Sequence, residues 1–391
     1  MTEHEDLVKA INGNMSDSIF FAKYPELVNG KDVGENPRFP FTEGGYDEQT
    51  IVAETMRFYS VAAMTGAKFL LPIQAPLEQV HNLHEKLGIP FDDSGVILFD
   101  NNDPTSYTST LNSLPKGSLH LLHPYNTINE DVCAINPRLL SYLNNKANLR
   151  EIVEISPKRK LITVDELLRK DNEIMKKPFV VKKTTGSSGD GVRILNSADE
   201  LPSLDGFLNN ETDIILEEFV DSAKNYGIQY FIGKDKRARF VGFNFQKTTE
   251  SGEFEGSVCC LSEKPDEGLV EVGFKACKNI AALGYWGFVG LDVLQNKAGD
   301  YYVIDPNIRA TAATPVYLLR NTLKDTLGDY VYVSSAKMMA GSAQQVINEI
   351  ENQGGMLLSM SHGGKGVYKY FAMFGADEPD KAISKFAQKN S

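Results

Sequence analysis

Carboxylate and amide side chains follow one another closely in the segment GLDVLQNKAGDYYVIDPNIR. Asp292 lies in one predicted strand, Asp305 ends the next, and Asn307 stands just beyond it. The intervening NKAGD is a strong turn signal, so we expect an antiparallel hairpin that sets Asp292 beside Asp305. Three converging oxygen ligands suit Mg²⁺, which binds carboxylates together with substrate phosphates. Arg309 could contact a transferring phosphoryl group beside the metal. The alternative interpretation is a plain turn after a solvated Asp292.

A glycine-rich loop follows a second candidate, Lys182. Residues 178–182 (PFVVK) predict an apolar strand, and TTGSSGDGV comes after it. Backbone amides and hydroxyls in such a loop can surround phosphate oxygens, and Lys182 would add a point charge. The small residues concerned are Gly186, Ser187, Ser188, Gly189 and Gly191. The spacing fits neither GxxxxGK(S/T) nor GxGxxG, and a hairpin turn is the alternative interpretation.

An acidic pair follows a third apolar strand, predicted at residues 214–216. The pair is Glu217 and Glu218, and Phe219 and Val220 follow it where one predicted structural unit gives way to the next. A hinge at this position would offer backbone donors and acceptors to a flat heterocycle held between apolar side chains. Acidic residues at the end of a strand are usually only solvated, which is the alternative interpretation.

The order of these motifs resembles that of the ATP-grasp superfamily. In that family a lysine opens the nucleotide-binding half, and a strand ending in lysine leads to a flexible glycine-rich loop. A hinge strand then contacts adenine, and an acidic residue followed by an acidic-x-Asn-x-Arg cluster holds Mg²⁺. The matching positions are Lys146, Pro178 to Lys182 with the loop after it, Glu217 to Val220, Asp292, and Asp305 to Arg309. Many members have Glu where this chain has Asp292 and Asp305, and both residue types ligate Mg²⁺.

The resemblance implies an α/β (α+β) architecture, the ATP-grasp fold. We expect an N-terminal parallel-sheet domain at residues 1–145 and a lid subdomain with the glycine-rich loop at 146–222. A C-terminal mixed-sheet subdomain with the Mg²⁺ site is expected at 223–391. The implied activity is that of an ATP-dependent carboxylate–amine ligase, which forms an amide bond through an acyl phosphate. We expect an amino acid or a small peptide-like acid as its substrate.

The resemblance also implies a role for each candidate residue. Arg309 and Lys182 would be catalytic, with Arg309 stabilising the acyl phosphate and the tetrahedral intermediate. Lys146 and Lys182 would contact the α- and β-phosphates of ATP, and the glycine-rich loop would close over the γ-phosphate. Mg²⁺, or Mn²⁺ as a substitute, would be held by Asp292, Asp305 and Asn307. The residue that contacts the ribose is left open between Asn225 and Gln229.

Two other activities fit the same motifs. In the first, a thiol of a carrier protein or of coenzyme A replaces the amine, which predicts a basic docking patch that this acidic chain does not obviously provide. In the second, the chain binds nucleotides without catalysis; the presence of all three metal ligands and Arg309 argues against this. Substrate specificity is expected in the loops at Tyr24–Gly45 and Lys247–Gly268. A homodimer is expected only because homodimers are the commonest oligomers of soluble proteins.

Alternating strands and helices must position these residues. A parallel sheet is expected from strands at 19–21, 69–71, 96–99 and 119–122 with helices at 48–64 and 77–87. Later elements are expected as a helix at 164–175, strands at 227–232 and 238–245, a hairpin or loop at 247–268, a helix at 269–283 and strands at 287–294 and 301–305. A helical C-terminal region should follow. Its break at His362–Gly366 is either a connector or an anion-binding turn.

Composition excludes several classes of protein. The chain has 391 residues, 42% of them hydrophobic, and 40 Lys and Arg against 52 Asp and Glu give a net charge of −12. This is typical of a soluble globular protein and not of a general nucleic-acid binder. We find no signal peptide and no apolar run long enough to span a membrane. Four cysteines without a CxxC motif are typical of reduced thiols, so we expect a cytoplasmic protein without a membrane or nucleic-acid partner.

Overall fold

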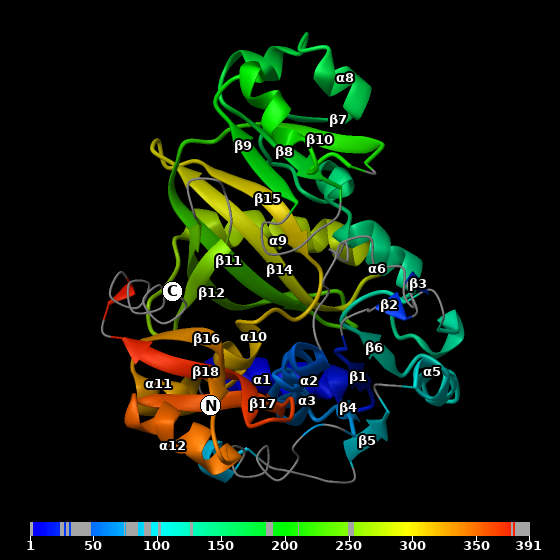
Figure 1. Cartoon of the computed structure of the whole chain (residues 1–391), viewed down its shortest axis with the longest axis vertical. Helices are drawn as coiled ribbons and strands as arrows, with labels where there is room; N and C mark the ends of the chain where they lie inside the picture. Colours follow the sequence, from blue (N-terminus) through cyan, green and yellow to red (C-terminus); the bar gives the residue numbers. More distant parts are fainter. Residues whose placement is uncertain are drawn as a thin grey trace.

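The computed structural model describes most of the chain as a body with a lobe above it (Figure 1). The described residues are 3–23, 27–28, 31–32, 48–73, 75, 85–89, 95–100, 103–125, 128–184, 191–209, 211–248, 254–376 and 378–379. Residues 185–190 of the glycine-rich loop, which include the candidates Gly186, Ser187, Ser188 and Gly189, therefore lie outside them. So do most of residues 24–45 and of the predicted helix at 77–87. Among the described helices, none is long and apolar enough to cross a membrane.

A four-stranded parallel sheet forms the N-terminal part of the chain, in the order β5-β4-β1-β6. Its strands are β1 (Ile19–Phe21), β4 (Lys68–Pro72), β5 (Val96–Phe99) and β6 (Leu119–Leu121). The helices of this part are α1 (Glu3–Met15), α2 (Glu48–Met56), α3 (Tyr59–Thr65) and α5 (Pro104–Asn112). The parallel sheet is therefore confirmed, and short apolar strands alternate with the helical segments as predicted. This part of the chain also contains a short antiparallel hairpin of β2 (Leu27–Val28) and β3 (Lys31–Asp32).

The single helix predicted at residues 48–64 is wrong in one respect, because Arg57 and Phe58 separate α2 from α3. The Phe58 side chain is buried in the core, and the Arg57 guanidinium lies 5.0 Å from the centre of the Phe371 ring. Packing against a strand far along the chain thus interrupts a helix that apolar periodicity alone would continue.

The lobe at the top of Figure 1 is a four-stranded antiparallel sheet in the order β7-β10-β8-β9. Its strands are β7 (Arg159–Thr163), β8 (Phe179–Lys183), β9 (Val192–Leu195) and β10 (Asp213–Glu218). The helix predicted at 164–175 is shorter in the structure. A capping box of Thr163 and Glu166 begins α8 (Val164–Leu168), and Lys170 then takes a positive φ of 59°, which ends the helical path.

An eight-stranded sheet runs through the middle and lower body in the order β15-β14-β11-β12-β13-β16-β18-β17, and each neighbouring pair is antiparallel. Its strands are β11 (Ser222–Ile232), β12 (Ala238–Thr248), β13 (Phe254–Cys260), β14 (Gly287–Asn296), β15 (Tyr301–Asn307), β16 (Tyr330–Met339), β17 (Gly355–His362) and β18 (Val367–Ala376). The helices that accompany it are α9 (Glu267–Ala282), α10 (Thr314–Leu318), α11 (Arg320–Leu327) and α12 (Ala343–Asn352). Parallel and antiparallel sheets with helices confirm the α/β (α+β) class, whereas the predicted domain boundaries after residues 145 and 222 stay predictions.

Of the two alternatives predicted for 247–268, the hairpin is confirmed, because the end of β12 pairs antiparallel with β13. The prediction of a helical C-terminal region is wrong in part, since β16, β17 and β18 lie there beside α10, α11 and α12. In β18, Tyr370 and Ala372 pack into one buried cluster and Phe371 and Met373 into another. Because both faces of this strand are covered, its sequence lacks the polar and apolar alternation that identifies a half-buried strand. The glycines after His362 form the turn between β17 and β18.

The two faces of the middle strands have different compositions. From β11, β12 and β14, one face sends Tyr226, Phe243 and Val293 into a core that includes residues of α9. The opposite face presents small and polar residues, among them Gly227 and Asp292, to a cleft. Strand alternation therefore separates the packing residues of this sheet from those that can meet a ligand.

Candidate functional site

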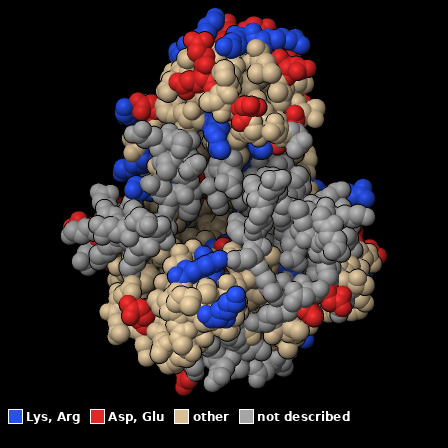
Figure 2. Space-filling model, in the orientation of Figure 1, with Lys and Arg blue, Asp and Glu red and all other residues tan. Residues whose placement is uncertain are grey.

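A cleft with a volume of about 390 Å³ lies between the upper lobe, the polar face of the eight-stranded sheet and the junction of α2 with α3. Figure 2 shows this face of the molecule hollowed between the lobe and the body, with Lys or Arg side chains below the hollow. The volume is within the range of small-molecule sites in proteins. Every predicted site residue that the structure describes, apart from Gly191, lines the cleft: Lys146, Lys182, Glu217, Glu218, Phe219, Val220, Asn225, Asp292, Asp305, Asn307 and Arg309.

The predicted hairpin brings the metal-ligand candidates together. Asp292 of β14 pairs directly with Asp305 of β15, and the Asn307 amide donates a hydrogen bond of 3.1 Å to the Asp292 carboxylate. On its other side, the Gln246 amide donates to Asp292 at 2.8 Å. Burial and the neighbouring Asp305 carboxylate raise the pKa of Asp292. A divalent cation would relieve this repulsion between two carboxylates, so the arrangement suits one.

Lys146 links the metal-ligand candidates to the upper lobe. It follows α6 (Pro137–Asn144) at the start of a 3₁₀ turn that the Asn145 side chain caps. Its backbone amide donates to the Thr184 carbonyl at 3.0 Å, next to the glycine-rich loop. Its ammonium group is buried and lies 3.0 Å from the Asp305 carboxylate. The Lys146 side chain thus contacts the carboxylate pair, while the Lys146 backbone contacts the end of the strand that leads to the glycine-rich loop.

A buried ion network holds the second lysine. Glu217 of β10 is opposite Arg159 of β7 and diagonal to Lys182 of β8, so all three side chains share one face of the lobe sheet. The Lys182 ammonium lies 2.6 Å from the Glu217 carboxylate, which also accepts from the Arg159 guanidinium, at 2.8 Å from Nε. Arg159 in turn donates to the Lys146 carbonyl at 3.0 Å. Burial lowers the pKa of Lys182, and the Glu217 carboxylate acts in the opposite direction.

This network changes the interpretation of the hinge. The Glu217 side chain is only 2% exposed and is committed to the two cations, whereas Glu218 is exposed. Apolar side chains close the neighbouring end of the cleft from both the lobe and the large sheet. They include Val192 and Ile194 from β9 and Ile304 from β15. A flat aromatic group would fit between such walls, beside the backbone of the hinge.

Arg309 stands just after β15, where Asn144 fixes the backbone. The buried Asn144 side-chain oxygen accepts from the Ile308 amide at 3.0 Å and from the Arg309 guanidinium at 3.4 Å. A helix end and a strand end therefore meet at this residue, which keeps its guanidinium in the cleft. Because Arg309 lines the same cleft as Asp292 and Asp305, its guanidinium could contact an anion that is bound in the cleft with a metal ion.

The two candidates for the ribose contact differ in their hydrogen bonds. Gln229 is 3% exposed, accepts from Thr314 at 2.7 Å and donates to Thr311, so its amide is committed to the protein. Asn225 is half-buried and donates to Thr248 at 3.3 Å. Both line the cleft, and the geometry favours Asn225 as the residue with an exposed polar atom.

Sequence reasoning missed several residues that support the site. Arg159, Asn144 and Gln246 were not singled out, although each contacts a predicted site residue. The alternation in FNFQ at residues 243–246 carried a signal for Gln246, because it places two amides on the face opposite two phenylalanines. No local pattern marks Arg159 or Asn144, whose partners lie far along the chain.

Gly227 is expected to be essential for the position of Gln246. It pairs with Asp292 across the sheet, and a Cβ atom there would lie 2.7 Å from the Asn244 oxygen and 2.9 Å from the Gln246 nitrogen. We expect Gly227→Ala to move the Gln246 amide away from Asp292 and to reduce Mg²⁺-dependent activity about tenfold or more. Steady-state ATP turnover at several Mg²⁺ concentrations measures this effect.

The matched control for this prediction is Gly13→Ala in α1, where an added Cβ meets nothing within 4 Å. It should keep full activity and gain up to about 1 kcal/mol of stability, because alanine favours the helix. Full activity of the Gly227→Ala variant at low Mg²⁺ would contradict the expected role of Gln246.

The described residues fit a nucleotide with a divalent cation. Among them, no cluster of three or more His, Cys, Asp or Glu side chains occurs, so the oxygen ligands available are two carboxylates and an amide. Mg²⁺ needs few protein ligands when phosphates and water complete its shell. The cations Lys146, Lys182 and Arg309 line the same cleft and could neutralise those phosphates.

Comparisons with known proteins agree with this geometry. A family model described as L-aspartate–L-methionine ligase, ATP grasp, matches residues 157–307. Biotin carboxylase 2 (chloroplastic) of Populus trichocarpa is 24% identical over 204 residues, or 46% of this chain. The matched segment spans only 37% of that curated relative.

Solved structures match over a larger share of the chain. An ADP complex of N5-carboxyaminoimidazole synthetase from Staphylococcus aureus has a TM-score of 0.58 and 11% identity, and the match covers 87% of this chain and 94% of that one. An ATP complex of carboxyaminoimidazole ribonucleotide synthase from Aspergillus clavatus has a TM-score of 0.57 and 12% identity, with 86% and 97% covered. At these identities the shared property is the fold.

Proposed function

We propose that this chain, which has the ATP-grasp fold and matches an ATP-grasp family model over residues 157–307, is an ATP-dependent ligase that joins an amino acid or a small peptide-like acid to an amine through an acyl phosphate. The observation that carries the proposal is one cleft holding the Asp292–Asp305 pair together with Lys146, Lys182 and Arg309. The matched family model supports amino acids as the substrate class, since its description names L-aspartate and L-methionine.

The proposed reaction has two steps. An oxygen of the substrate carboxylate attacks the γ-phosphorus of ATP, a new P–O bond forms, and the bond to the β-phosphate oxygen breaks to release ADP. The amine nitrogen then attacks the acyl carbon of the acyl phosphate. A C–N bond forms, the C–O bond to phosphate breaks, and the nitrogen loses a proton to solvent. Both steps move negative charge, so stabilising that charge is the main demand on the protein.

We assign the charged residues to this demand. Asp292, Asp305 and Asn307 would hold Mg²⁺, which would supply positive charge to neutralise the phosphates. Lys146, 3.0 Å from the Asp305 carboxylate, and Lys182, 2.6 Å from the Glu217 carboxylate, would contact the α- and β-phosphates. Arg309, with its backbone fixed through Asn144, would stabilise the oxyanion of the tetrahedral intermediate.

The nucleotide base and ribose are assigned to the lobe and the neighbouring strand. The hinge at Glu218–Val220 would bind adenine through its backbone, and Glu217 would act by positioning Lys182. Asn225 would contact the ribose. The glycine-rich loop, including Gly191, is proposed to cover the γ-phosphate.

The site of action is proposed to be the cytoplasm. All four cysteines are free and buried, which is typical of proteins from a reducing compartment. Two further expectations, a homodimer and Mn²⁺ as a substitute for Mg²⁺, stay predictions.

Hydroxylamine trapping tests the proposal. The protein would be incubated with ATP, Mg²⁺, hydroxylamine and pools of amino acids and small carboxylic acids, and hydroxamate and ADP would be quantified. We expect one pool to give hydroxamate in a 1:1 ratio with ADP, because hydroxylamine captures the activated acyl group. ATP binding without hydroxamate from any pool would favour a nucleotide-binding protein without catalysis, and absence of ATP binding would overturn the site assignment.

Two further arms of the same assay separate the related activities. Replacing hydroxylamine by coenzyme A or by amino acids distinguishes a thiol acceptor from an amine through the mass of the product. Labelled bicarbonate belongs among the acids, because the similar solved structures include carboxyaminoimidazole synthetases that match over most of this chain. If bicarbonate were the only acid that gave a product, bicarbonate would take the place of the amino acid as the proposed carboxylate substrate.

A further inference from the structure

Three uncharged polar side chains form one wall of the cleft. Asn244 and Gln246 of β12 alternate with two phenylalanines that face the core side of the sheet, and Ser257 of β13 pairs directly with Gln246. All three line the cleft, and we call them the polar wall. The proposed reaction gives no role to Asn244 or Ser257, so this wall needs a separate explanation.

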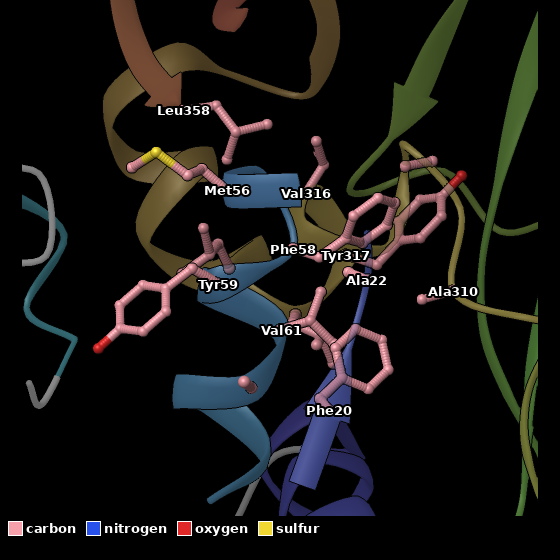
Figure 3. Packing of buried hydrophobic residues seen from close by; sticks show 14 of the residues in the cluster. Phe20, Ala22, Met56, Phe58, Tyr59, Val61, Ala310, Val316, Tyr317 and Leu358 are labelled. Carbon is pink, nitrogen blue, oxygen red and sulfur yellow. The ribbon is translucent and has the colours of Figure 1, made fainter. Parts of the chain in front are cut away.

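A buried tyrosine of α10 fixes the orientation of Asn244. The Tyr317 hydroxyl donates to the Asn244 side-chain oxygen at 3.0 Å. Burial raises the pKa of Tyr317 well above its ordinary value, so the hydroxyl keeps the proton that it donates. The Tyr317 ring belongs to the buried cluster shown in Figure 3 and lies over Gly242 of β12, where any Cβ atom would overlap the ring. The glycine therefore leaves room for the tyrosine beside Asn244.

The other end of the Asn244 amide faces the cleft. None of the described residues accepts a hydrogen bond from its Nδ2 atom, and yet this atom is not one of the buried polar atoms that lack a partner. Because Asn244 lines the cleft, its Nδ2 atom is accessible from there. Asn244 thus offers an N–H donor to a ligand, while Tyr317 occupies its oxygen.

Gln246 is held in the opposite sense. Its Nε2 atom donates to the Asp292 carboxylate at 2.8 Å. Among the described residues none donates to its Oε1 atom, which is likewise not one of the buried unpaired atoms. Gln246 therefore offers an acceptor. Because Gln246 is two positions after Asn244 on the same strand, a donor and an acceptor stand on one face of the sheet, next to a candidate metal ligand.

This combination of groups selects the chemistry of a ligand. A carboxylate has only acceptors and would face the Gln246 oxygen, whereas an ammonium group has only donors and would face the Asn244 N–H. An amide carries both a C=O and an N–H group and can satisfy both residues. The Ser257 hydroxyl donates or accepts, so it is compatible with the same ligand. A site built around such groups rejects an analogue that leaves one of them unpaired.

We propose that Asn244 and Gln246 bind an amide group of the acid substrate and that Tyr317 positions Asn244 for this contact. The amide is assigned to the acid because Gln246 contacts Asp292, beside which the carboxylate would be phosphorylated. Two kinds of acid carry such a group: peptides have it in the backbone, and asparagine and glutamine have it in the side chain. This inference rests on the proposed ligase function and narrows the class of its acid substrate.

Matched pairs of acids test this inference in the hydroxylamine assay. Asparagine and glutamine are compared with their side-chain methyl esters, and glycylglycine and alanylalanine with analogues in which an ester replaces the peptide bond. Each ester lacks the amide N–H but keeps the shape. We expect kcat/KM for ATP-dependent hydroxamate formation to be about 100-fold or more higher for the amide in one of the two groups. A preference in the first group identifies a side-chain amide, and one in the second identifies a peptide bond.

Variants of the polar wall separate recognition from folding. Asn244→Asp replaces the Nδ2 donor by an oxygen and Asn244→Ala removes the amide, so both should reduce the preference about tenfold or more, mainly through the KM of the amide acid. Tyr317→Phe should reduce the preference by a smaller factor, because the Asn244 amide can then rotate. The readout is the ratio of kcat/KM for the amide acid to that for its ester. Loss of folded protein lowers both values equally and leaves this ratio unchanged.

The matched control is Tyr230→Phe. It removes another buried hydroxyl, which donates to the Val270 carbonyl at 2.7 Å and does not line the cleft, so the ratio should stay at the wild-type value. An unchanged ratio in both Asn244 variants, or hydroxamate only from acids without an amide, would overturn the inference and leave the ligase proposal standing. A wild-type ratio in Tyr317→Phe alone would overturn its positioning role. Absence of hydroxamate from every acid, with ATP bound, would overturn both proposals.

Discussion

The Asp305→Asn variant should lose Mg²⁺-dependent turnover by about 10²- to 10³-fold while remaining folded. Asp305 lies directly opposite Asp292 and 3.0 Å from the Lys146 ammonium, so the substitution removes one of two carboxylates proposed to hold the metal. Loss of a single charge-stabilising group typically costs this much when it acts on a transferring phosphoryl group or oxyanion. Hydroxamate and ADP formation over a range of Mg²⁺ concentrations measures the effect.

Stability should change little in the same variant, because two effects oppose each other. Removing the Asp305 charge relieves the repulsion that raises the pKa of Asp292. The substitution also replaces the charged partner of the buried Lys146 ammonium by a neutral amide, but the Asp292 carboxylate still attracts that ammonium. We therefore expect a change in the free energy of unfolding within about 1 kcal/mol, which separates loss of metal binding from loss of fold.

The control for Asp305→Asn is the same substitution at an exposed position. Asp131, whose side chain is 70% exposed and lies 3.7 Å from Lys116, should tolerate Asp131→Asn without effect on turnover. Wild-type activity of the Asp305→Asn variant at low Mg²⁺ would remove this carboxylate from the proposed metal site.

Local sequence patterns were sufficient to predict the hairpin that brings Asp292 near Asp305, but not its register. The five-residue turn sets Val293 opposite Val303, and a regular ladder would then place Asp292 opposite Ile304. A β-bulge between Asp292 and Val293 shifts the pairing by one residue, so that Asp292 faces Asp305. The four parallel strands of the N-terminal sheet were predictable because apolar runs between helical segments identify them.

Long-range contacts explain what the sequence did not predict. Arg159 and Glu217 meet because two strands pair across the lobe, and Arg57 reaches the cleft because it stacks on Phe371 of β18. Such partners are chosen by tertiary packing, which no local propensity encodes. The strands β17 and β18 were mistaken for helices because both of their faces are covered, and a strand buried on both sides has no alternation to detect.

The Glu217→Gln variant should be destabilised by about 3 to 5 kcal/mol, which is the largest stability effect we expect from one substitution in the lobe. Glu217 is the shared partner of Arg159 and Lys182, and all three side chains are at most 5% exposed. Glutamine keeps the shape but not the charge, so two buried cations lose their counter-charge. Urea unfolding followed by circular dichroism measures the free energy of the first unfolding transition.

The pH dependence of this loss identifies its cause. Burial already lowers the pKa of Lys182, and the Glu217 charge opposes that shift, so the pKa should fall further in the variant. A lysine whose pKa is lower in the folded state than in the unfolded state adds stability as the pH rises through the folded value. The difference in the free energy of unfolding between the variant and the wild type should therefore become smaller as the pH rises from about 7 to about 10, near the ordinary pKa of lysine.

The neighbouring residue provides the control for Glu217→Gln. Glu218 is exposed at the end of the same strand, so Glu218→Gln should change stability by less than about 0.5 kcal/mol at either pH. If both variants were equally stable, the network around Glu217 would not depend on its charge. A large loss that stayed constant between the two pH values would instead place the cost on Arg159, which keeps its charge throughout this range.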